Sequence, residues 1–114
     1  MVFGPLATTA LFLAGACTQD REPVAVPLAR LVSEQESFEG KDVETRGTVR
    51  AFGEDPATRH YVVEDARANR VQLVPDRVAD GYVGREVMVA GEFGFDERRG
   101  RFIRIDRISP STER

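Results

Sequence analysis

The sequence VETRGTVRAF, residues 43–52, decides the fold, because its side chains alternate in character with a period of two. One side of the segment collects small or apolar residues, from Val43 to Ala51, and the other side collects mostly polar and charged ones. Alternation of this kind predicts a β-strand with one buried face. Gly47 stands in the middle of the pattern and predicts a bulge or a strong bend, as closure of a small sheet requires.

Four later segments alternate in the same way and are predicted strands. They are His60–Glu64, Arg70–Val74, Glu86–Phe95 and Phe102–Ile108, with a second mid-strand glycine at Gly91. Pro75 ends the third strand, because proline cannot donate to a ladder. Two helical patterns accompany the strands: one from Pro27 to Glu36, with apolar residues at helical spacing, and a short one from Arg77 to Gly84.

Five strands in a chain of this size favour closure into a barrel, since closure leaves no long hydrophobic edge exposed. At this point the chain resembles the OB-fold, and within it the small exported bacterial domains related to the anticodon-binding-like group. The segments that carry the resemblance are FEGKDV 38–43, GTV 47–49, YVVED 61–65, GREV 84–87, VAG 89–91 and 100–108. The resemblance implies a mainly β, five-stranded Greek-key barrel, with an N-terminal helix and a short helix between strands three and four.

The amino-terminal residues predict export. Val2–Ala16 carries no charge, is mostly apolar and ends in small residues directly before Cys17, the one cysteine of the chain. This arrangement resembles a lipoprotein signal peptide, in which the cysteine is cut free and acylated. An ordinary signal cut that leaves Cys17 unmodified is the alternative. We therefore expect a signal peptide at 1–16, a flexible tether at 17–26, the OB domain at 27–108 and a polar, frayed tail at 109–114.

The predicted location follows from the same segment. A lipid at Cys17 would hold the protein on a membrane of the cell envelope, at the periplasmic face if the cell is Gram-negative.

The chain offers little for catalysis. His60 is the one histidine, so it cannot supply the usual cluster of several metal ligands. Acidic pairs such as Glu64-Asp65 occur in turns, but their spacing does not match a calcium loop. No glycine loop of the phosphate-cradling kind is present. We expect a protein that is not an enzyme and has no metal and no cofactor.

The usual ligand surface of the OB-fold comprises strands two and three and the loops after strands one and four. Mapping by position assigns to it Arg50, Phe52, Arg59, His60, Tyr61, Arg70, Gln72, Arg98, Arg99 and Arg101, with Phe95 and Phe102 nearby. Arginines interleaved with aromatic rings suit stacking on bases or sugars. Local ion pairs and core packing are the structural alternative for these residues.

The predicted function is that of a non-catalytic binding module whose partner is an envelope protein, a glycan or a small anionic ligand. The net charge of −3 supports this function over one that rests on phosphate contacts. Binding of single-stranded nucleic acid is the alternative, and the oligomeric state stays open.

Overall fold

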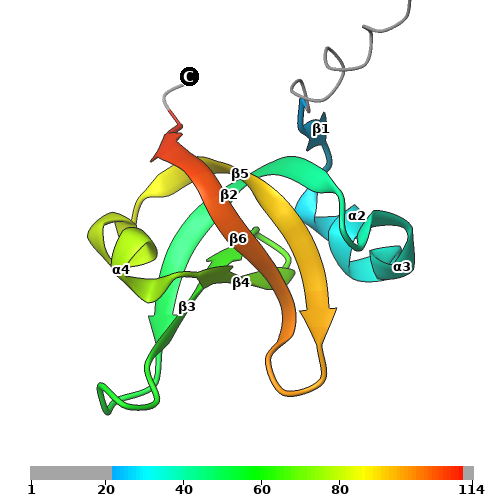
Figure 1. Cartoon of the computed structure of the whole chain (residues 1–114). Helices are drawn as coiled ribbons and strands as arrows, with labels where there is room; N and C mark the ends of the chain where they lie inside the picture. The colour runs from blue at the N-terminus through cyan, green and yellow to red at the C-terminus, as the bar shows by residue number, and fades with distance from the viewer. Residues whose placement is uncertain (1–21, 112–114) are drawn as a thin grey trace, which may run out of the picture.

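Five strands close into a ring in the computed structural model, which describes residues 22–111 (Figure 1). In chain order the elements are β1 (Val24–Ala25), α2 (Leu28–Ser33), α3 (Gln35–Phe38), β2 (Asp42–Phe52), β3 (His60–Glu64), β4 (Arg70–Val74), α4 (Asp76–Ala79), the 3-10 helix η1 (Asp80–Tyr82), β5 (Glu86–Asp96) and β6 (Gly100–Pro110). The mainly β fold expected from the alternating segments is confirmed.

The ring closes because β2 is long enough to pair with two strands. Its first half, Asp42–Thr48, pairs antiparallel with β5, and its second half, Thr48–Phe52, pairs antiparallel with β3. β6 then joins β5 in antiparallel fashion and β4 in parallel fashion. The resulting order β2-β3-β4-β6-β5-β2 is that of an OB-type Greek-key barrel.

The barrel interior holds the inward-pointing side of every alternating segment. The fully buried side chains include Val43, Val49, Val63, Val71, Leu73, Val87, Val89, Phe93 and Ile103. Helix α2 adds Leu28 and Leu31, and α4 adds Ala79. Figure 1 shows α2 and α3 on one side of the barrel and α4 on the other, so that both helical segments cover the apolar interior. Burial of this apolar surface is the main stabilising contribution to a domain of this size.

Several boundaries differ from the sequence-based expectation. The helix expected from Pro27 to Glu36 breaks at Glu34, whose φ of −124° is not helical, so α2 and α3 are separate. Val24 and Ala25, expected in the tether, pair with β2 as the short parallel strand β1. Residues 109 and 110, expected in a frayed tail, continue β6 opposite β5. The predicted signal peptide and Cys17 lie outside the described residues.

The two mid-strand glycines have different roles. At Gly91 the β5–β6 pairing shifts register, and a Cβ there would overlap the Arg104 carbonyl oxygen. Gly91 therefore marks a β-bulge. At Gly47, where a bulge or a strong bend was predicted, the β2 pairing continues without a register shift, so there is no bulge. A Cβ on Gly47 would instead meet the Glu64 carbonyl oxygen at 2.7 Å, which means that glycine permits a close approach of two strands.

Candidate functional site

The outer wall formed by β3, β4 and their neighbours carries arginines and aromatic rings. Because Val71 and Leu73 of β4 point inward, Arg70 and Gln72 point outward. The same parity turns Phe52, His60 and Phe102 outward from β2, β3 and β6. We call this surface the arginine face. Its residues are Arg50, Phe52, His60, Arg70, Gln72, Arg99, Phe102 and Arg104.

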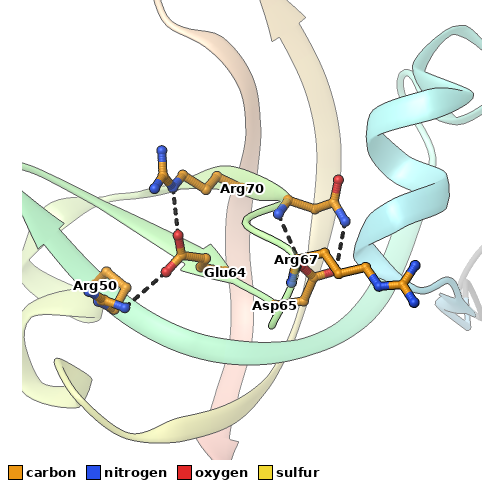
Figure 2. Close-up of polar contacts among 6 residues, drawn as sticks. Arg50, Glu64, Asp65, Arg67 and Arg70 are labelled. Atoms are coloured by element: carbon orange, nitrogen blue, oxygen red, sulfur yellow. Dashed lines mark hydrogen bonds and ion pairs between the residues drawn. The ribbon is translucent and has the colours of Figure 1, made fainter.

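Glu64 lies between two arginines of this face. Arg50 Nη1 lies 3.0 Å from one carboxylate oxygen of Glu64 and Arg70 Nε lies 2.7 Å from the other (Figure 2). The Glu64 side chain is 10% exposed, whereas both arginines are about half exposed, at 53% and 50%. One covered carboxylate thus orients two cationic groups toward solvent and leaves this cluster with a net positive charge.

Phe52 forms the first aromatic site of the face. Its ring stacks against His60, with centroids 5.9 Å apart and an interplanar angle of 29°. The Arg70 guanidinium lies 4.9 Å from the centre of the same ring. These contacts join three strands into one patch of flat, polarisable groups.

Phe102 forms the second aromatic site. Arg99 and Arg104 lie 5.2 Å and 5.7 Å from its ring centre. The ring rests over β5 at Gly94, where a Cβ would come within 2.7 Å of the Phe102 ring. Glycine therefore makes room for the ring, and the two arginines hold it in place by cation–π contact.

Two loops flank the face, and Figure 1 shows both at the same end of the barrel. In the loop between β5 and β6, the backbone N–H groups of Arg98 and Arg99 donate to the Asp96 carboxylate at 2.8 Å and 3.4 Å. The bond from Arg98 is the main cause that lowers the pKa of Asp96. In the loop between β2 and β3, the Arg59 guanidinium donates to the carbonyl oxygens of Gly53 and Glu54.

The structure brings most of the predicted site residues together. Arg50, Phe52, His60, Arg70, Gln72 and Arg99 lie on the arginine face, and Arg59 and Arg98 lie on the flanking loops. Arg101 is half-buried and pairs with Phe95, which is 46% exposed and lies on the side of β5 opposite to Gly94. The Arg101 Nε atom is buried and has no hydrogen-bond partner among the described residues.

Tyr61 does not lie on the arginine face. It is 6% exposed and belongs to the core, because it shares the inward parity of Val63. Its hydroxyl reaches the end of the barrel and donates to Asp80 at 2.8 Å. Glu64 and Arg104 were not assigned to this surface from the sequence. Alternation places Glu64 on the same side of β3 as His60, and Arg104 on the same side of β6 as Phe102, so the signal for both was present.

No group of three or more His, Cys, Asp or Glu side chains in residues 22–111 is arranged to hold a metal ion. None of the helices in this range has the length and hydrophobicity that crossing a membrane requires.

Comparison with known proteins establishes the fold. No protein family model matches the chain, and no curated protein is significantly similar to it. A solved structure described as an aspartyl-tRNA synthetase from Leishmania major Friedlin aligns with a TM-score of 0.55 and 16% identity, over 86% of this chain and 22% of that chain. The OBody AM1L10, bound to hen egg-white lysozyme, aligns with a TM-score of 0.50 and 17% identity, over 68% and 85%.

The asparaginyl-tRNA synthetase from Pyrococcus horikoshii aligns at a TM-score of 0.49 and 18% identity, over 82% of this chain and 24% of that one. The chain thus spans about a quarter or less of either synthetase. At these identities the first two alignments support the OB-type barrel and nothing finer.

Proposed function

We propose that this barrel binds single-stranded nucleic acid on its arginine face. The observation that carries the proposal is the pairing of two aromatic sites, Phe52 and Phe102, each with exposed guanidinium groups above the ring. Single strands bind to such surfaces because bases stack on flat side chains while cations follow the phosphates. The fold is shared with an enzyme whose name gives tRNA as its substrate, which supports this ligand class.

The arginines over the rings determine how a base would enter. A base either stacks on the outer side of a guanidinium or displaces it from the ring toward a phosphate, and both arrangements are favourable. Stacking contributes about 1–3 kcal/mol per base. Two aromatic sites and the cations around them are therefore sufficient for binding at low salt, despite the net charge of −3.

Binding of a fluorescent single-stranded oligonucleotide of about eight nucleotides, followed by anisotropy at several salt concentrations, tests the proposal. We expect affinity to fall as salt rises, and Arg70→Ala to weaken binding and reduce the slope against log salt by about 0.7. Arg107→Ala is the matched control, because it removes an exposed arginine opposite Ala90, away from the face. The proposal fails if the oligonucleotide does not bind at low salt, or if both variants behave alike.

A protein, a glycan or a small anionic ligand on the same face is the second candidate. The net charge of −3 favours it, because repulsion by the rest of the molecule weakens long-range attraction of a polyanion. A structure of this fold bound to lysozyme supports a protein partner. Absence of oligonucleotide binding together with saturable binding of a sulfated glycan would favour this candidate.

We also propose that the protein is exported and anchored by acylation of Cys17. The uncharged apolar leader before Cys17 supports this, and the ligand would then be met in the cell envelope. Intact mass of the mature protein tests it: cleavage before Cys17 with added acyl mass is expected. Identical membrane fractionation of wild type and Cys17→Ser would contradict it.

A further inference from the structure

A polar hollow lies at the edge of the arginine face, between the loop that follows β2 and the helix α4. Its volume is about 380 Å³, and it is lined by Pro56, Arg59, Tyr61, Asp76, Arg77 and Asp80. We call it the α4 pocket. Arg59 of the lining is the neighbour in sequence of His60, which stacks on Phe52. A strand that stacks a base on Phe52 would bring a neighbouring base to this opening.

The Asp80 carboxylate of the pocket is held in a fixed orientation. The Tyr61 hydroxyl, on the rigid wall of the barrel, donates to Asp80 Oδ1 at 2.8 Å. This hydrogen bond is the main cause that raises the pKa of the Tyr61 phenol above its ordinary value. One lone pair of Oδ1 and both of Oδ2 remain available to a ligand. Asp80 therefore offers a two-oxygen acceptor edge that is already oriented.

The donor side of the pocket is fixed as well. Arg59 Nε and Nη2 donate to the carbonyl oxygens of Gly53 and Glu54 at 3.4 Å and 3.3 Å. These contacts use two of the five guanidinium N–H groups, and the Arg59 side chain also interacts with the Tyr61 hydroxyl. Arg59 and Asp80 thus both lie next to the Tyr61 hydroxyl, where one edge of a base can meet a donor and an acceptor together.

The charges of the pocket select the base over the phosphate. Asp76 and Asp80 balance Arg59 and Arg77, so the lining carries no net charge. A lining without net charge gives no net attraction for a phosphate group, whereas a neutral, planar group with donors and an acceptor on one edge suits both the carboxylate and the guanidinium.

Among the four bases, guanine matches this arrangement. Its Watson–Crick edge carries two adjacent donors, N1–H and the 2-amino group, beside the O6 acceptor. A carboxylate accepts both donors at once, and an arginine donates to O6. Adenine, cytosine and uracil each have at most one donor position on that edge, so they leave one carboxylate oxygen without a partner.

We propose that the α4 pocket binds a guanine base of a single strand, with Asp80 accepting from N1–H and the 2-amino group and Arg59 donating to O6. This inference rests on the proposed function and adds a sequence preference to it. The discrimination against adenine should be about tenfold, the lower part of the range for a bidentate side chain–base pair.

The test uses the full chain and four labelled RNA oligonucleotides: uridine throughout, or uridine with one central guanosine, inosine or adenosine. Inosine keeps N1–H and O6 but lacks the 2-amino group. We expect guanosine to bind about tenfold more tightly than adenosine, with inosine in between. In Asp80→Asn the ratio of guanosine to adenosine affinity should fall to near one, because the carboxamide replaces an acceptor with a donor. Asp106→Asn, an exposed carboxylate of β6 away from the pocket, should keep the wild-type ratio.

The outcomes separate the two proposals. Equal affinity for all four oligonucleotides overturns the guanine site and leaves single-strand binding standing. No binding of any of them overturns both. A guanosine preference that survives in Asp80→Asn assigns the preference to another place and overturns the pocket. If Asp80→Asn does not fold, the inosine series with the wild type and Tyr61→Phe decides, since the latter should lower the ratio by releasing the carboxylate.

Discussion

Glu64 controls the arginine face at the scale of single residues. Its carboxylate is nearly covered, and it neutralises part of the charge of Arg50 and Arg70 while it holds both in place. A covered carboxylate in contact with two exposed arginines limits the attraction for a polyanion. Glu64 therefore orders the arginine side chains of the face and at the same time lowers its positive potential.

Glu64→Gln should tighten oligonucleotide binding several-fold at low salt, because the amide removes the negative charge and can keep one hydrogen bond to an arginine. The gain should diminish as salt rises. Anisotropy titrations at two salt concentrations measure it, with Glu36→Gln on helix α3 as the control for the same change of net charge. Equal or weaker binding by Glu64→Gln at low salt would show that the ordering of the arginines outweighs their charge.

Asp65 stabilises the turn that joins β3 to β4. Its carboxylate accepts from the backbone N–H groups of Arg67 and Asn69 and from the Asn69 amide, each at 2.9 Å (Figure 2). Burial alone would raise the pKa of Asp65, but the hydrogen bonds from Asn69 and Arg67 outweigh it and lower the pKa below its ordinary value.

Asp65→Ala should therefore reduce the free energy of unfolding by about 1–2 kcal/mol at pH 7. A folded-state pKa below the unfolded one means that the stabilisation is fully present above the unfolded pKa and is lost as the pH falls through the folded pKa. Urea unfolding of both proteins should show a constant difference from about pH 7 to 5 that shrinks below about pH 4. A difference that grows toward acid would contradict the account of this turn.

At the scale of elements, closure of the barrel depends on glycines where strands meet at short distance. Gly91 lies at the β5 bulge, where the missing Cβ would overlap the Arg104 carbonyl group. Gly81, in the 3-10 helix η1, has no atom within 4 Å of its Cβ position. Gly91 has no room for a Cβ atom, whereas Gly81 has room, so the same substitution to alanine can be compared at the two positions.

Gly91→Ala should lower the free energy of unfolding by about 3 kcal/mol, because β6 must move to relieve the overlap. Gly81→Ala should leave it unchanged or raise it slightly, since alanine restricts the unfolded chain. Urea midpoints measured by circular dichroism test this pair. Similar midpoints for the two variants would mean that the bulge tolerates a side chain and does not fix the closure.

The sequence predicted correctly those strands in which buried and exposed residues alternate over several positions. The bounds of β3 and β4 agree with the expected strands, and the inward parity of Val63 also explains why Tyr61 is buried. The break at Glu34 had no such signal, because the apolar spacing of Leu28, Leu31 and Val32 is helical on its own. The strand β1 has two residues, too few for a pattern, and forms through its pairing with β2.

In the candidate site as well, the sequence predicted the residues of alternating strands but not the contacts between strands. Alternation places Arg50, Phe52 and His60 on the outer wall, and the fold brings Phe102 beside Gln72 through the parallel β4–β6 pairing. The ion pairs of Glu64 and the rotation of Arg99 over Phe102 depend on distances between strands, which the sequence does not encode locally. The α4 pocket joins residues 56–61 to residues 76–80. Arg59 and Tyr61 were among the predicted site residues, whereas Asp76, Arg77 and Asp80 had no signal in the sequence.

At the scale of the whole molecule, the negative net charge does not describe the charge of the arginine face, which is positive. The chain carries −3 overall, yet the arginine face gathers four arginines on one wall, two of which pair with Glu64. Composition therefore argued against a phosphate-binding function that the arrangement of the face supports. The distribution of charge over the barrel is the property that the ligand would meet.

Chemical-shift mapping of the ¹⁵N-labelled protein during titration with a single-stranded oligonucleotide tests the central claim most directly. The account predicts that the largest shifts cluster at Phe52, His60, Arg70 and Phe102, with little change at Arg107 and Ser109 on the other wall. Shifts centred on that other wall, or no shifts at saturating oligonucleotide and low salt, would contradict it.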